Sequence, residues 1–284
     1  MRLRIIIIVL SAIVVGTVAA AFAAGGDATG RDHDSVVAAF YPLAYAAEQL
    51  GGPRLRVTNL TPAGAEPHDL ELSPADVATV KAARLVLLMG HGFQPQVERA
   101  ARGSNARVVS LLDAPGLRRM GDDPHVWLDP LRYAVPVRAI GKVMHANAAP
   151  LLARLHALDR AYRAGLAHCA ARDLVTSHAA FGYLTRRYGL RQIAVEGLVP
   201  EAEPAPRDLA RAVATVRASG ATTVFTEPLA SPQVARTVAR ESGTTVSPLD
   251  PLEGLSPRAL AAGADYFTVM RANLAAIRKG LGCR

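Results

Sequence analysis

Short runs of β-branched and other apolar residues alternate with helical stretches along this chain, and the alternation occurs twice. This order is typical of parallel sheets, because parallel strands need long crossover connections that are usually helices. We therefore predict an α/β protein with two lobes, each built on a mostly parallel sheet. The predicted strands cover residues 36–40, 55–60, 85–89 and 107–111 in the first half, and 174–177, 192–195, 222–226 and 244–246 in the second.

The middle of the chain lacks this alternation. Residues 131–168 contain no strand-like run, and leucines at 151, 152, 155 and 158 recur at helical spacing. We predict two helices, or one bent helix, with a break near residues 147–150. The predicted organisation is an N-terminal lobe at residues 32–130, a helical connector at residues 131–168 and a C-terminal lobe at residues 169–284. Clefts between domains commonly bind ligands, so we expect a site between the lobes.

Residues 1–23 have the composition of an export signal. Arg2 and Arg4 precede a long apolar run, and the small-residue sequence Ala21-Phe22-Ala23 has the pattern of a cleavage site. An uncleaved membrane anchor is the alternative, because the uncharged run is long enough to span a bilayer. In both cases we expect the folded part to lie outside the cytoplasm, in the periplasm or at the extracellular face of the cytoplasmic membrane.

Two cysteines are present, Cys169 and Cys283. An even number of cysteines in an exported protein favours a disulfide. This pair would attach the C-terminus to the beginning of the second lobe. Two unpaired thiols are the alternative.

The chain has 32 Lys and Arg residues against 24 Asp and Glu residues, a formal net charge of +8. Its arginines are scattered through the predicted helices, with few aromatic residues between them and no nucleic-acid-binding motif. We interpret the charge as a solvated basic surface and expect no nucleic-acid partner.

Three histidines and one aspartate lie in loops that follow predicted strands. His68 and His125 follow the second and fourth strands of the first lobe, and His178 and Asp250 follow the first and last strands of the second. Ligands of open α/β sheets bind beyond the carboxyl ends of the strands. Three imidazoles and a carboxylate suit tetrahedral Zn²⁺ and also other divalent transition metals. The sequence therefore predicts a metal site made of these four residues, with His91, another loop residue after a strand, as an alternative ligand.

Around these residues the chain resembles the metal-specific solute-binding proteins of ABC importers, the cluster that carries zinc and manganese. The resemblance implies two α/β lobes joined by a long helix, with the metal held between them by His68, His125, His178 and Asp250. It implies capture of Zn²⁺ outside the cytoplasmic membrane and delivery to a membrane permease, and we expect a monomer. The matching segments are residues 66–69, 73–76, 124–130, 176–183, 225–228 and 249–252.

The third histidine bears on the identity of the metal. Manganese-binding members of this family tend to have glutamate at the position of His178, so the imidazole favours zinc. The alternatives are a manganese-delivering homologue, a metal-containing surface adhesin, and a secreted zinc hydrolase with Glu66 or Glu227 as general base. A hydrolase is disfavoured because four protein ligands leave no position for a catalytic water, and no H-E-x-x-H motif is present. We therefore predict no catalytic residue.

Overall fold

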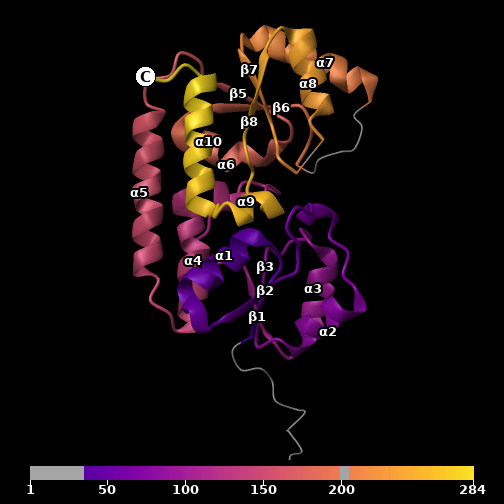
Figure 1. The fold of residues 1–284 in the computed structure, drawn as a ribbon, viewed down its shortest axis with the longest axis vertical. Helices are drawn as coiled ribbons and strands as arrows, with labels where there is room; N and C mark the ends of the chain where they lie inside the picture. Colours follow the sequence, from indigo (N-terminus) through magenta and orange to yellow (C-terminus); the bar gives the residue numbers. More distant parts are fainter. Residues whose placement is uncertain (1–34, 199–204, 230) are drawn as a thin grey trace, which may run out of the picture. The chain divides into compact units, whose positions relative to one another are not determined.

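The computed structural model describes residues 35–198, 205–229 and 231–284 (Figure 1). The predicted export signal, residues 1–23, lies outside the described residues. Across the part of the chain that is described, no helix combines the length and apolar character needed to cross a membrane.

The first sheet has four parallel strands in the order β2-β1-β3-β4. All four residues of β3 are buried, which is expected for an inner strand of a sheet that is covered on both faces. Helix α1 contacts α4 and helix α2 contacts α3, so a pair of helices lies on each side of the sheet (Figure 1). The elements are β1 (Ser35–Ala38), α1 (Tyr41–Gly51), β2 (Arg56–Asn59), α2 (Pro74–Ala82), β3 (Leu85–Leu88), α3 (Pro95–Arg102), β4 (Arg107–Ser110) and the short 3-10 helices η1 (Gly52–Arg54), η2 (Pro67–Asp69) and η3 (Val126–Leu128).

The second sheet repeats this topology, with four parallel strands in the order β6-β5-β7-β8. In both sheets the first strand of the lobe is an inner strand, and the chain moves outward from it in both directions. The two parallel sheets confirm the predicted α/β class. The elements are β5 (Asp173–Thr176), η4 (Ala179–Phe181), α6 (Gly182–Tyr188), β6 (Arg191–Ala194), α7 (Pro206–Ser219), β7 (Thr223–Thr226), α8 (Gln233–Ser242), β8 (Thr245–Pro248), α9 (Pro257–Ala261) and α10 (Tyr266–Gly280).

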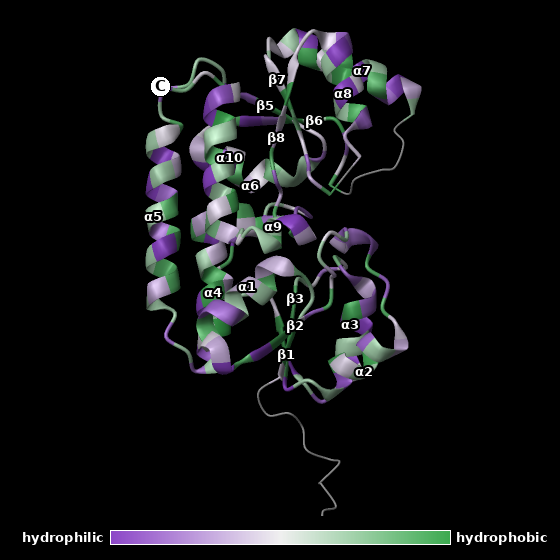
Figure 2. Ribbon diagram, viewed as in Figure 1, coloured by the Kyte–Doolittle hydropathy of each residue, from purple (hydrophilic) through white to green (hydrophobic). Residues whose placement is uncertain are grey.

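Two helices connect the sheets, α4 (Pro130–Met144) and α5 (Ala149–Gly165). The turn between them begins at His145, which has a left-handed backbone (φ 53°). Helix α5 shows hydrophobic and hydrophilic residues in alternation along its length (Figure 2), as expected for a helix with one packed face and one solvated face. It packs against α10, where the Tyr162 hydroxyl donates a hydrogen bond of 2.7 Å to the carbonyl oxygen of Met270.

One hydrophobic core runs through both lobes. It contains buried side chains from β1 and β3, from both connector helices, and from α6 and α10. A smaller core lies between the second sheet and the helices α7 and α8. A disulfide joins Cys169, just after α5, to Cys283, just after α10. The lobes are therefore held to each other by shared packing on the side of α4, α5 and α10.

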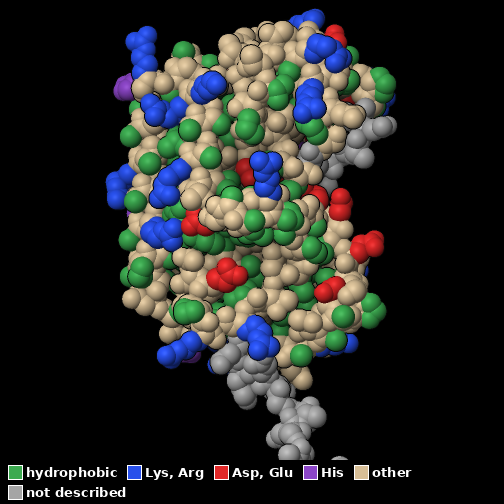
Figure 3. Space-filling model, viewed as in Figure 1, with side chains coloured by type: hydrophobic (Ala, Val, Ile, Leu, Met, Phe, Trp, Pro, Cys, Tyr) green, Lys and Arg blue, Asp and Glu red, His purple; other side chains and the backbone are tan. Residues whose placement is uncertain are grey.

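Charged residues are spread over the surface. Figure 3 shows Lys and Arg side chains dispersed across this face, with Asp and Glu side chains between them. On the face shown, the basic side chains do not gather into one patch.

Candidate metal centre

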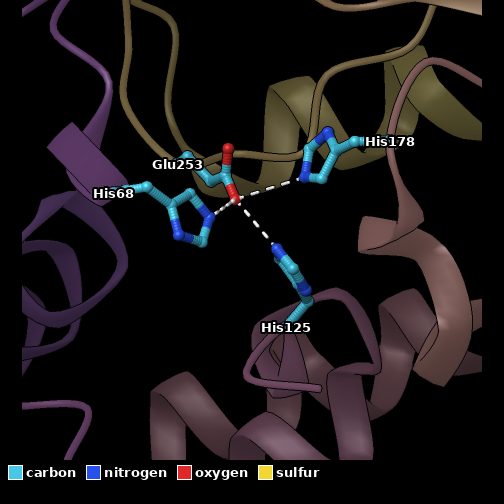
Figure 4. Close-up of side chains that lie close together, drawn as sticks. All are labelled: His68, His125, His178 and Glu253. Atoms are coloured by element: carbon cyan, nitrogen blue, oxygen red, sulfur yellow. Dashed lines mark hydrogen bonds and ion pairs between the residues drawn. The ribbon is translucent and has the colours of Figure 1, made fainter. Parts of the chain in front are cut away.

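Four side chains from separate loops converge beyond the carboxyl ends of the two sheets. His68 is on η2, His125 directly precedes η3, His178 follows β5, and Glu253 lies in the loop after β8. One donor atom from each side chain lies within 4.8 Å of the other three. Figure 4 shows the three imidazoles pointing toward one carboxylate oxygen. Two of the donors come from the first lobe and two from the second.

The Glu253 Oε1 atom is at the centre of the group. It lies 3.2 Å from His68 Nε2, 2.9 Å from His125 Nε2 and 3.6 Å from His178 Nε2. The side chains of His125 and His178 are fully buried, Glu253 is 1% exposed and His68 is 6% exposed. This site therefore has three nitrogen donors and one oxygen donor, and all four side chains are almost inaccessible to solvent.

Two of the imidazole rings are held by carboxylates at Nδ1, on the opposite side of the ring from the Nε2 atom that faces the cluster. His125 Nδ1 lies 2.8 Å from Asp123 Oδ1, which also accepts the His125 backbone N–H at 2.9 Å. His178 Nδ1 lies 2.6 Å from Glu227 Oε2, and Glu227 Oε1 accepts the His178 N–H at 3.1 Å. A carboxylate bonded to Nδ1 fixes the ring and directs Nε2 toward the cluster, the arrangement usual around metal-binding histidines.

The same carboxylates set the protonation of the metal-free site. Burial opposes the charge on His178, but Glu227 and Glu253 outweigh it and raise its pKa to about 10. The pKa of His125 is also raised, because Asp123 and Glu253 outweigh its burial. Burial likewise opposes the charge on Glu253, but the surrounding histidines lower its pKa well below the ordinary value. A metal ion that bound here would have to displace the proton of His178.

Two further acids lie near the cluster, and the pKa of each is raised. Burial and the charge of Glu253 raise the pKa of Glu66 to about 8, and its Oε1 atom accepts the His68 backbone N–H at 3.3 Å. Burial raises the pKa of Asp250 to about 6. At neutral pH Glu66 is therefore mostly neutral, whereas Asp250 stays mostly ionised.

One predicted ligand lies apart from the other three. Asp250 is outside the group of donors, and Glu253 stands in its place. The Asp250 Oδ1 atom accepts the Leu252 backbone N–H at 2.7 Å, so the carboxylate is directed into its own turn. Glu253 could have been considered from the sequence, because it is the other acid in an otherwise apolar loop at residues 249–255.

The alternative ligand and both suggested bases have other partners. His91 Nε2 lies 2.7 Å from Asp113 Oδ1 in an exposed pair, outside the donor group. Glu227 binds His178, and Glu66 caps the turn that carries His68. These contacts give the two glutamates structural roles at the site.

Known proteins are similar to this chain in sequence and in fold. The zinc-binding protein AdcA of Streptococcus pyogenes serotype M3 is 32% identical over 283 residues, which cover 86% of this chain. The chain spans about half of that relative, 55% of its length. The laminin-binding protein Lmb of Streptococcus agalactiae has a TM-score of 0.79 at 28% identity, covering 87% of this chain and 99% of Lmb.

A zinc-loaded structure is also similar. The Zn(II)-bound ZnuA-like domain of AdcA from Streptococcus pneumoniae has a TM-score of 0.75 at 32% identity, covering 87% of this chain and 98% of that domain. Over residues 36–280 the sequence matches the ZnuA family, described as the periplasmic component A of the zinc-uptake complex. The match confirms the predicted family: the chain belongs to the ZnuA family of zinc-uptake proteins.

Proposed function

We propose that this chain captures one Zn²⁺ outside the cytoplasm with His68, His125, His178 and Glu253 and delivers it to an ABC-type importer. The observation that carries the proposal is the convergence of three imidazole nitrogens and one carboxylate oxygen within 4.8 Å. Three nitrogens and one oxygen form a donor set that tetrahedral Zn²⁺ accepts. The zinc-bound state of the similar AdcA domain supports the same cargo.

Zinc is favoured over manganese by the donor types. Mn²⁺ prefers carboxylate, carbonyl and water oxygens in six-coordinate geometry, whereas this pocket offers mostly imidazole nitrogen. A manganese-delivering homologue would need additional oxygen donors. Glu66 and Asp250 are the nearby acids that could supply them, and burial favours the neutral form of each.

Capture and release, rather than catalysis, suit a site with four protein donors. A catalytic zinc keeps a coordination position for water or substrate. Here the four donors would fill the tetrahedron, and the ZnuA family consists of uptake components rather than enzymes. We infer that the partner is a membrane permease and that the chain acts as a monomer in the periplasm or at the outer face of the cytoplasmic membrane.

A surface-adhesin role is a second candidate. It is favoured by the similarity to Lmb, which is described as bifunctional, with adhesin and metal-transporting activity. Binding of the purified protein to immobilised laminin, measured with and without Zn²⁺, tests this candidate separately from zinc transport.

Zinc stoichiometry is the direct test of the proposed function. Elemental analysis of the exported protein should give one zinc per chain, and Zn²⁺ should outcompete Mn²⁺ in titrations against a chelator. His178→Ala and Glu253→Ala should each lose tight binding. His91→Ala is the matched control, because it removes a histidine outside the donor group and should leave the affinity unchanged. Loss of zinc from the control alone, or none bound by wild type, would refute the proposal.

A further inference from the structure

The turn that presents Glu253 contains an unusual backbone conformation. Leu252, the residue before Glu253, has a positive φ of 58° and is fully buried. A left-handed backbone is unfavourable for a leucine, so surrounding interactions must hold it there. Those interactions determine where the Glu253 carboxylate points, because the two residues are adjacent.

Asp250 supplies one of these interactions. Its Oδ1 atom accepts the Leu252 N–H at 2.7 Å, a side-chain-to-backbone bond that closes a turn over residues 250–252. The carboxylate thus acts on the backbone that directly precedes Glu253.

A buried asparagine attaches the same turn to α10. Asn273 Oδ1 accepts the Asp250 N–H at 2.9 Å, and Asn273 Nδ2 donates to the Asp250 carbonyl oxygen at 2.7 Å. Both backbone groups of Asp250 are therefore occupied by one rigid side chain. This leaves the Asp250 carboxylate free to act on the turn.

The other lobe holds the turn at its next residue. Trp127 Nε1 donates to the Pro251 carbonyl oxygen at 2.7 Å, and the Tyr266 hydroxyl donates to the Trp127 carbonyl oxygen at 2.6 Å. Trp127 is two residues after His125, so the loops that carry His125 and Glu253 are bonded to each other. The turn is fixed on both sides, and the Asp250–Leu252 bond lies within it.

We propose that Asp250 is a positioning residue for zinc binding, which holds the Leu252 backbone so that Glu253 reaches the three imidazoles. This inference rests on the proposed function, since it explains how the fourth donor of that site is oriented. The role needs a hydrogen-bond acceptor at Oδ1 and not a negative charge. An asparagine can provide the same acceptor, whereas a metal ligand or an electrostatic partner would depend on the charge.

The test compares variants at both positions in the full exported protein. The zinc dissociation constant is measured by chelator competition for wild type, Asp250→Asn, Asp250→Ala and Glu253→Gln. We expect Asp250→Asn to stay within about threefold of wild type, and Asp250→Ala to weaken binding about 10- to 100-fold, the usual effect of losing a group that orients a metal ligand. Glu253→Gln should weaken it at least as much as Asp250→Ala.

Cobalt provides a readout that reports on donors rather than on overall stability. The visible absorption of the Co²⁺-loaded protein should be the same in wild type and Asp250→Asn, and should change in Asp250→Ala in the same direction as in Glu253→Gln. If Asp250→Ala does not fold, the comparison of Asp250→Asn with Glu253→Gln still distinguishes a positioning role of Asp250 from direct metal binding.

Two results would overturn the inference while leaving the zinc site intact. These are an Asp250→Asn variant as weak as Glu253→Gln, which would show that the charge binds metal, and an Asp250→Ala variant with wild-type affinity. A wild-type protein that binds no zinc would overturn the proposed function as well.

Discussion

The metal-free protein should become less stable as the pH rises above neutrality. Burial opposes the charge on His178, but Glu227 and Glu253 outweigh it and raise its pKa to about 10. A group whose pKa is raised by folding stabilises the fold fully below its unfolded pKa, and this contribution is lost as the pH rises through the folded value. The pKa of Glu66 is raised to about 8, so the loss of its proton above neutral pH also lowers the stability of the metal-free protein.

The size of the effect follows from proton linkage. A proton held by the folded but not the unfolded chain changes the free energy of unfolding by about 1.4 kcal/mol per pH unit. His178 alone should therefore lower the stability of the metal-free protein by roughly 3 kcal/mol between pH 7 and pH 9. Zinc displaces the same protons, so its apparent affinity rises over this range. Stabilisation by zinc should increase as the metal-free protein becomes less stable.

Urea unfolding at several pH values measures both quantities. Protein treated with a chelator is compared with protein saturated with Zn²⁺ between pH 6.5 and 9, and His178→Gln serves as the control that should reduce the slope of the metal-free curve. A metal-free stability that stays constant or rises across this range would refute the assignment of a protonated His178. A zinc effect that shrinks with increasing pH would refute the proton displacement.

Three other variants probe the supports of the site. Glu227→Ala removes the carboxylate from the ring of His178, a proposed zinc ligand, and should weaken zinc binding about 10- to 100-fold in chelator competition. Replacing Cys169 and Cys283 by serine should lower the free energy of unfolding by about 4–5 kcal/mol on the chain-entropy model, with little change in zinc affinity. His125→Ala should lower the free energy of unfolding of the metal-free protein by about 3 kcal/mol in urea unfolding, more than His68→Ala, because it leaves the buried Asp123 without its histidine and removes one of the three histidines around Glu253. Equal losses for these two variants would contradict this reasoning.

The fold could be predicted because its signals are local. Each strand is a short apolar run, and each predicted strand overlaps an observed one to within a few residues. Ser73 followed by Pro74 predicts a helix start, and in the structure α2 begins at Pro74 with a capping box formed by Ser73 and Asp76. The break between α4 and α5 is also near its predicted place. Helix α9 was not predicted, because it is a single short turn of helix over Pro257–Ala261.

The histidines of the site could be predicted for a similar reason. In a parallel sheet, residues directly after the strands meet at one edge, and His178 lies two residues after β5. The supporting contacts could not be predicted, since they join residues far apart in the chain. Glu227 reaches His178 across 49 positions, and Trp127 reaches Pro251 across 124.

The position of Glu253 depends on both lobes rather than on strand β8 alone. Asp250 was predicted as the fourth ligand because it lies in the loop after the last strand and in a segment that resembles the family. The loop that carries His68 is bonded to this segment by the Gly64 N–H, which donates to the Leu255 carbonyl oxygen at 3.0 Å. The loop that carries His125 is bonded to it through Trp127. Glu253 lies between these two attachments, so loops from the opposite lobe fix the segment on both sides. Its carboxylate can therefore lie among all three imidazoles, whereas Asp250 lies outside the two attachments and is retained by α10.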